Sequence, residues 1–99
     1  MSIKTNFIRL RRKSDDVKLS GLSASLLPEG GSAPGDLISL VQNSGINWQY
    51  DFPGQVTNGT YILYVNGVPV LNDGEPQEVR IIRNGIISAG DTDFAKDSW

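Results

Sequence analysis

The chain has 99 residues, 38% of them hydrophobic, and a formal net charge of −2. This length suits one domain with a single modest core, and the composition is ordinary for a globular protein. The chain contains neither cysteine nor histidine. This excludes disulfides, zinc sites with thiolate or imidazole ligands, and the Ser-His-Asp and Cys-His arrangements of nucleophilic enzymes. No apolar run has the length of a membrane span or the place of a signal peptide, so we expect a soluble protein made in a cytoplasm.

The first predicted strand, residues 3–10, leads into a cluster of basic side chains: Arg9, Arg11, Arg12 and Lys13. Residues 1–18 carry six basic and two acidic side chains, whereas the rest of the chain carries three basic and nine acidic ones. A basic arm on an acidic body suits contact with an acidic partner, or head-to-tail contact between copies. The alternative is solvated charge at a strand edge, which prevents unwanted pairing. Because nucleic-acid-binding domains spread their positive charge more widely, we expect no nucleic-acid partner.

Three further segments lead to the middle of the chain. Residues 17–27 alternate between apolar and polar side chains, and the phase changes at Gly21, where a β-bulge is expected. Residues 28–35 hold two prolines and three glycines, which predicts a loop. Residues 36–42 fit either a short helix capped by Asp36 or a strand.

The strand interpretation of residues 36–42 is favoured because Asn43-Ser44-Gly45 can close a three-residue hairpin loop. This loop would lead into residues 46–52, where apolar and polar side chains alternate strictly. The alternation places Trp48 and Tyr50 on one face, as a candidate platform for stacking against a glycan. The same pattern is typical of a strand that turns its aromatic face towards the core.

The clearest pattern lies in residues 60–71. Asn66-Gly67 between apolar residues predicts a hairpin with a two-residue type I′ turn, because both residues tolerate positive φ. This register pairs Val65 with Val68 and places both on one face with Leu63 and Val70. Pro69 has no N–H to donate, so we expect its strand to be short or at an edge.

A second hairpin is predicted over residues 78–89. A three-residue loop, Arg83-Asn84-Gly85, places four apolar side chains on one face: Val79, Ile81, Ile87 and Ala89. The residues that follow are acidic and polar but include Phe94 and Trp99. Two aromatic side chains on a polar end segment suit docking, on the chain's own core or on a partner.

About eight short strands joined by hairpins, with no convincing helix, predict an all-β fold. We expect a single small β-sandwich or partly open barrel of antiparallel strands. The domain would span residues 1–90, with residues 1–13 as its basic N-terminal strand or arm, followed by an acidic tail at 91–99.

No set of residues predicts catalysis. A pair of carboxylates such as Asp51 with Asp73 or Glu75 could in principle serve a hydrolase, but the spacing singles out no pair. Two oxygen-rich turns, at residues 72–75 and 91–93, do not match the twelve-residue calcium loop. We therefore expect a protein that is not an enzyme and that has no cofactor and no metal.

The segment Phe-Ile-Arg-Leu-Arg-Arg-Lys at residues 7–13 resembles the start of many bacteriophage tail-fibre and appendage proteins. The resemblance implies a symmetric virion protein whose first strand docks on a neighbouring component.

Together these observations favour a non-enzymatic interaction protein of a larger assembly, such as a phage capsid-decoration or tail-attachment protein. Its partners would be other virion proteins and copies of itself. The candidate partner-binding residues are Arg9, Arg11, Arg12, Lys13, Phe94 and Trp99. The alternative is a carbohydrate-binding module that uses Trp48 and Tyr50.

Overall fold

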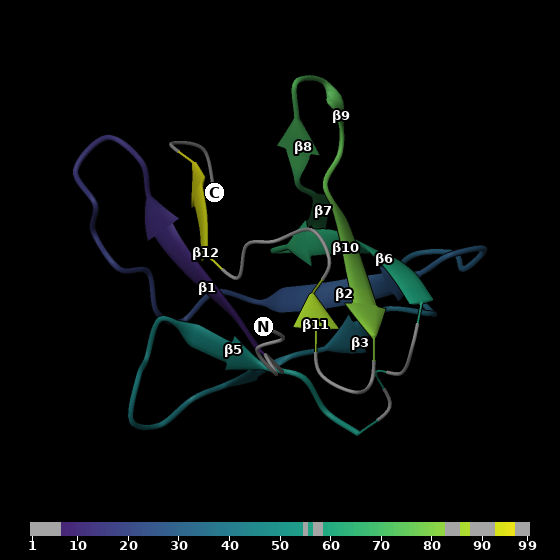
Figure 1. Ribbon diagram of the computed structural model, residues 1–99, viewed down its shortest axis with the longest axis horizontal. Helices are drawn as coiled ribbons and strands as arrows, with labels where there is room; N and C mark the ends of the chain where they lie inside the picture. The colour runs from purple at the N-terminus through teal and green to yellow at the C-terminus, as the bar shows by residue number, and fades with distance from the viewer. Residues whose placement is uncertain (1–6, 55, 57–58, 83–85, 88–92, 97–99) are drawn as a thin grey trace.

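The computed structural model describes residues 7–54, 56, 59–82, 86–87 and 93–96 (Figure 1). This part of the chain forms twelve short strands and no helix. In chain order the strands are β1 (Phe7–Arg12), β2 (Ala24–Pro28), β3 (Ile38–Ser39), β4 (Val41–Gln42), β5 (Gln49–Asp51), β6 (Gly59–Val65), β7 (Val68–Pro69), β8 (Leu71–Asn72), β9 (Glu75–Pro76), β10 (Glu78–Ile82), β11 (Ile86–Ile87) and β12 (Asp93–Lys96). These residues therefore contain no helix that is long and apolar enough to cross a membrane.

Ten of the strands form two sheets that are not closed into a barrel. The four-stranded sheet has the order β12-β1-β5-β4, and the six-stranded sheet has the order β11-β10-β6-β2-β3, with β7 also paired to β6. Strands β8 and β9 pair only with each other and stand away from both sheets at the top of Figure 1. The prediction of a small all-β fold with sandwich architecture is therefore confirmed.

Both sheets turn one face towards a shared core. On β1, Ile8 and Leu10 are fully buried, whereas Phe7 and Arg9 are half-buried on the opposite face, as the two-residue period of a strand requires. The buried apolar side chains are Ile8, Leu10, Ala24, Leu26, Tyr50, Val56, Tyr61, Leu63, Val65, Val70, Val79, Ile81 and Phe94.

The hairpin around Asn66-Gly67 is confirmed. Val65 pairs with Val68, and the turn residues have the positive φ of a type I′ turn, 55° at Asn66 and 79° at Gly67. Leu63 accepts a backbone hydrogen bond from Val70 at 2.9 Å, and both side chains are buried. Val68 shares their face but is exposed, because it lies at the end of the sheet.

The register of the second hairpin is also as predicted. Ile81 pairs with Ile87, and Ile82 pairs with Ile86, which leaves a connection of three residues. Val79 and Ile81 are buried. The loop residues themselves, and Ala89, lie outside the described residues.

The predicted hairpin loop at residues 43–45 is wrong. It would pair Gln42 with Ile46, but Gln42 pairs with Tyr50. The cause is the side chain of Asn43, whose Oδ1 accepts hydrogen bonds from the N–H groups of Gly45 and Ile46 at 2.8 Å each. These bonds stabilise a wider loop, closed by a 2.8 Å bond from the Asn43 N–H to the carbonyl of Gln49.

Residues 36–42 contain no helix, and the strand they form is divided between the two sheets. Strand β3 pairs with β2, whereas β4 pairs with β5 in the other sheet. The break falls at Leu40, whose N–H donates to the carbonyl of Ala24 at 2.9 Å. One short segment therefore connects both layers of the sandwich.

The expected boundary between domain and tail is also corrected. Strand β12 lies in the four-stranded sheet beside β1, and the two strands are parallel, with Leu10 opposite Phe94. The fold is therefore not entirely antiparallel, and residues 93–96 belong to the sandwich. The pairing is stable because it covers the outer edge of β1 and adds Phe94 to the core.

Candidate functional site

The basic cluster does not form a free arm. Residues 7–12 are strand β1, and the turn after it supplies counterions. Arg11 Nη1 lies 2.7 Å from Asp16 Oδ1, and Arg12 Nη1 lies 3.0 Å from Asp15 Oδ2. Lys13 is exposed, and its backbone N–H donates to the carbonyl of Lys96 at 3.2 Å.

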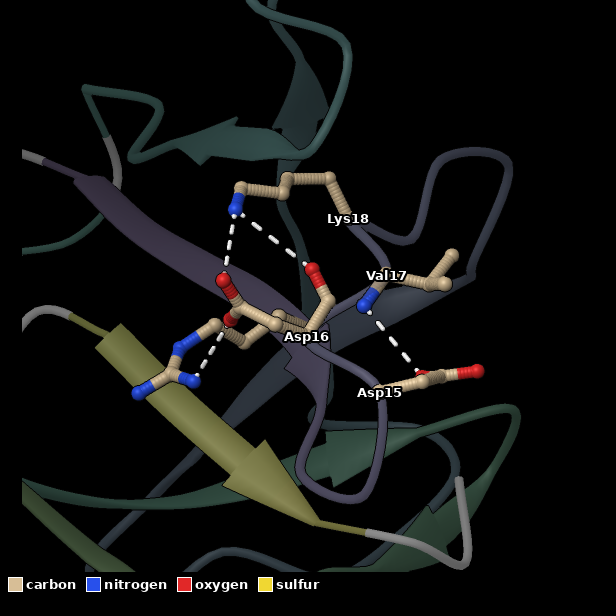
Figure 2. Close-up of polar contacts among 5 residues, drawn as sticks. Asp15, Asp16, Val17 and Lys18 are labelled. Carbon is tan, nitrogen blue, oxygen red and sulfur yellow. Dashed lines mark hydrogen bonds and ion pairs between the residues drawn. The ribbon is translucent and has the colours of Figure 1, made fainter.

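The carboxylate of Asp16 forms ion pairs with two basic side chains, Arg11 and Lys18. Figure 2 shows Lys18 reaching Asp16, where its Nζ lies 3.0 Å from Oδ2. The side-chain hydrogen bonds from Lys18 and then from Arg11 hold the pKa of Asp16 below its usual 3.8. Arg11 and Arg12 are thus paired locally, and we do not retain them as partner-binding residues.

Arg9 lies on the outer face of the four-stranded sheet, between aromatic rings. Its guanidinium carbon is 4.9 Å from the ring centroid of Phe7 and 5.2 Å from that of Trp48. Its Nε donates to Gln49 Oε1 at 3.1 Å, and Gln49 is only 7% exposed beneath it. Cation–π contacts of this kind stabilise a surface at exposed sites by about 0.5–1 kcal/mol. Arg9 therefore has a structural role as a cover for Gln49.

The predicted glycan platform is not formed. Tyr50 is 1% exposed and lies in the core, because its position opposite Ile8 faces inwards. Its hydroxyl donates to the carbonyl of Leu19 at 2.9 Å and accepts from the N–H of Leu22 at 3.1 Å. Burial raises the pKa of Tyr50 above its usual 10.0. A ring held in this way has no face to offer a sugar.

Trp48 is half-buried and lies in the loop before β5, not on the strand. Besides Arg9, Lys18 also contacts its ring, with Nζ 5.4 Å from the centroid. Two cations therefore lie against the indole that was expected to stack against a ligand.

Phe94 is 8% exposed and packs in the chain's own core. The prediction that it binds a partner is wrong, because the parallel pairing of β12 with β1 turns this side chain inwards. Trp99 lies outside the described residues. Of the predicted partner-binding residues that the structure describes, only Arg12 and Lys13 are exposed, and Arg12 is paired with Asp15.

The structure instead presents an exposed apolar surface around the first hairpin. Val68 is 62% exposed and Leu71 is 51% exposed. They border a pocket of about 360 Å³, which we call the hairpin pocket. Its lining consists of Val65, Asn66, Val68, Pro69, Val70, Leu71 and Lys96. This volume is at the lower end of the range of ligand pockets, roughly 300–1,000 Å³.

Strands β8 and β9 extend from the edge of this pocket as a short hairpin, residues 71–76, which we call the β8–β9 arm. Leu71 pairs with Pro76, and Asn72 pairs with Glu75. The tip is a tight two-residue turn, with a φ of 53° at Asp73 and 82° at Gly74. From Leu71 to Pro76 every side chain that the structure describes is exposed.

The chemistry of this surface is that of an apolar pocket with one basic side chain among the described residues. Within the described residues there is no group of three or more side chains that could hold a metal ion. From the described part of the chain, the pocket has aliphatic walls, the amide of Asn66 and one charged group, the ammonium of Lys96. An apolar side chain next to a carboxylate would be complementary to these groups.

Sequence reasoning missed the arm, although its signal is present. Asp73-Gly74 is, like Asn66-Gly67, a dipeptide typical of type I′ hairpins, and it was interpreted only as a polar turn. The position of Lys96 beside the first hairpin has no signal in the sequence, because it depends on the pairing of β12 with β1. Comparison of the chain with protein-family models, curated proteins and solved structures finds no match.

Proposed function

We propose that this protein is a non-enzymatic interaction module of a larger assembly, and that it binds a protein partner through the hairpin pocket and the β8–β9 arm. The observation that carries the proposal is the exposure of Val68 and Leu71 at the mouth of a pocket. Single exposed aliphatic residues are common, but two of them beside an apolar pocket form a patch, and patches of this kind mark interaction sites.

The arm supports the same proposal. A hairpin that projects from a domain exposes two strand edges and its side chains to a partner. Its tight turn holds it in one conformation, which lowers the entropy lost on binding.

We further propose that the assembly is a virion, with the protein serving in capsid decoration or in tail or fibre attachment. The support for this step is the resemblance of residues 7–13 to the start of tail-fibre proteins. The mechanism differs from a basic arm on an acidic partner, since Arg11 and Arg12 are paired with Asp16 and Asp15. Detection of the protein in purified particles by mass spectrometry tests this step, and its absence from them overturns it.

Site-specific photo-cross-linking tests the proposed surface. A photoreactive amino acid replaces Val68 in one variant and Glu29 in a control variant, which is exposed in a different loop. In cells that make the protein, position 68 is expected to give a discrete protein adduct, and position 29 is expected to give none. Equal and diffuse labelling from both positions would overturn the proposed surface.

A further inference from the structure

The proposed function does not say which protein is the partner. The charges around the pocket and on the arm indicate one. We infer that the hairpin pocket of one copy receives the β8–β9 arm of a second copy, so that two chains form a symmetric dimer by exchanging arms. This inference rests on the proposed function and names its partner.

The arm carries two acids at its tip. Asp73 and Glu75 are exposed, and among the described residues neither takes part in any of the ion pairs, which join Arg11, Arg12 and Lys18 to Asp15 and Asp16. Leu71 and Pro76 lie opposite each other at the base of the arm. The arm thus presents apolar side chains followed by carboxylates.

The pocket has the complementary chemistry. Its walls are aliphatic apart from the amide of Asn66, and Lys96 is the one charged side chain that the described residues contribute. Lys96 forms no ion pair with the described residues. An apolar wall beside an unpaired ammonium matches, in order and in sign, the apolar base and acidic tip of the arm.

The base of the arm already forms part of the wall of its own pocket. Leu71 belongs both to the pocket lining and to the first strand of the arm, and the tip follows two residues later through a turn of fixed geometry. A hairpin this short extends away from its base, as Figure 1 shows. Among the described residues the acids at its tip form no ion pair with Lys96 of their own chain, which leaves them for the Lys96 of a second copy.

Because pocket and arm lie side by side, one two-fold axis satisfies both contacts at once. Each copy gives an arm and receives one, which is the arrangement of an isologous dimer. The arm spans only residues 71–76, whereas a standard interface has roughly 20–30 residues on each side. We therefore expect a dissociable dimer that forms at high protein concentration and weakens with salt.

Sedimentation velocity on the purified full chain, from about 10 μM to about 1 mM, tests the dimer. The wild-type protein is expected to shift from monomer to dimer across this range. Lys96→Glu (K96E) is expected to remain monomeric, and so is the variant that combines Asp73→Asn with Glu75→Lys (D73N/E75K). Asparagine is chosen at position 73 because it tolerates positive φ.

The decisive step is to mix the two monomeric variants. In a dimer with exchanged arms, the acidic arm of K96E meets the unchanged Lys96 of D73N/E75K, and the basic arm of D73N/E75K meets the acid introduced by K96E. Mixing is therefore expected to restore the dimer. Arg80→Glu, a charge reversal at an exposed position of β10, is the control and should leave dimer formation unchanged. Circular dichroism verifies that each variant is folded.

Three results would overturn the inference: a wild-type protein that is monomeric throughout, variants that dimerise like the wild type, or a mixture that remains monomeric. These results would overturn the dimer without overturning the proposed function, which the cross-linking experiment tests separately. If the cross-linker at position 68 captures a different protein while the wild type is monomeric, the interaction surface stands and the second copy as its occupant does not.

Discussion

Asn66 is hydrogen-bonded twice to Ser23, the residue that precedes β2. The N–H of Asn66 donates to the carbonyl of Ser23 at 2.8 Å, and the Asn66 Oδ1 accepts from the N–H of Ser23 at 3.2 Å. The same residue also has a φ of 55° as the first residue of the hairpin turn. Asn66 thus both forms the turn and attaches it, through its backbone and its side chain, to the residue before β2.

Replacing Asn66 separates these two roles. Asn66→Gly keeps a residue suited to positive φ but removes the side-chain bond, so the free energy of unfolding should fall by about 1 kcal/mol. Asn66→Ala also places a Cβ in the left-handed region, which should cost roughly 1–2 kcal/mol more. Urea denaturation measures both values. An alanine variant as stable as the glycine variant would show that the turn does not depend on this residue.

The hydroxyl of Tyr50 anchors the segment that leads into β2. Tyr50→Phe leaves the N–H of Leu22 and the carbonyl of Leu19 without this partner, so we expect a loss of about 1–3 kcal/mol in the free energy of unfolding. Tyr64→Phe is the matched control, because no hydrogen bond is found for that half-buried hydroxyl among the described residues. Equal effects in thermal or urea denaturation would contradict the anchoring role.

Tyr50 also predicts how stability changes in alkaline solution. Burial raises its pKa in the folded state above 10.0, so the folded protein holds this proton more tightly than the unfolded chain does. The contribution to stability is complete below about pH 10 and is lost as the pH rises through the higher folded-state pKa. In a spectrophotometric titration of the folded protein, Tyr50→Phe should remove a phenol that ionises above pH 10.0. A titration above pH 10.0 that is unchanged in Tyr50→Phe would contradict the assignment.

The stability of a Phe94 variant shows whether residues 93–96 form a core strand or a free tail. Since Phe94 is buried opposite Leu10, Phe94→Ala should lower the free energy of unfolding by about 3–5 kcal/mol. Val68→Ala removes methyl groups that are largely exposed and should change it by less than about 0.5 kcal/mol. Guanidinium denaturation of both variants checks the difference. A Phe94→Ala protein with wild-type stability would return this residue to the candidate partner-binding set.

Asp16 should titrate below its usual range. Lys18 and Arg11 lower its pKa below 3.8, so its contribution to stability is present above about pH 4 and is lost as the pH falls through the lower folded-state pKa. Titration followed by NMR should show the pKa of Asp16 rising towards 3.8 in Lys18→Met. Arg80→Met, which removes a distant positive charge, should leave it unchanged. If both variants give the same value, the hydrogen bond from Lys18 is not the main cause.

The hairpins could be predicted from sequence because their turns are determined locally. Asn66-Gly67 requires positive φ at both residues, and the alternation around it sets which side chains face the core. The three-residue connection after Ile82 followed from the same reasoning. The loop after Gln42 was predicted wrongly because a single Asn43 side chain stabilises a wider turn, and alternation alone does not detect such a bond.

The candidate site depends on a pairing that has no local signal. The parallel contact of β1 with β12 joins Leu10 to Phe94 across most of the chain. It determines that Phe94 is buried and that Lys96 reaches the hairpin pocket. The count of charges detected six basic side chains near the start of the chain, but it did not detect that Arg11, Arg12 and Lys18 are paired with Asp15 and Asp16.

The parallel pair of β1 and β12 also has a mechanical consequence. These are the first and last strands of the described chain, and they run in the same direction side by side (Figure 1). Tension applied before β1 and after β12 would therefore pull the two strands past each other, in shear. In that geometry the hydrogen bonds along the pair bear the load together and must break at once, whereas an antiparallel terminal pair would open one bond at a time. The protein should consequently resist stretching better than its small size suggests.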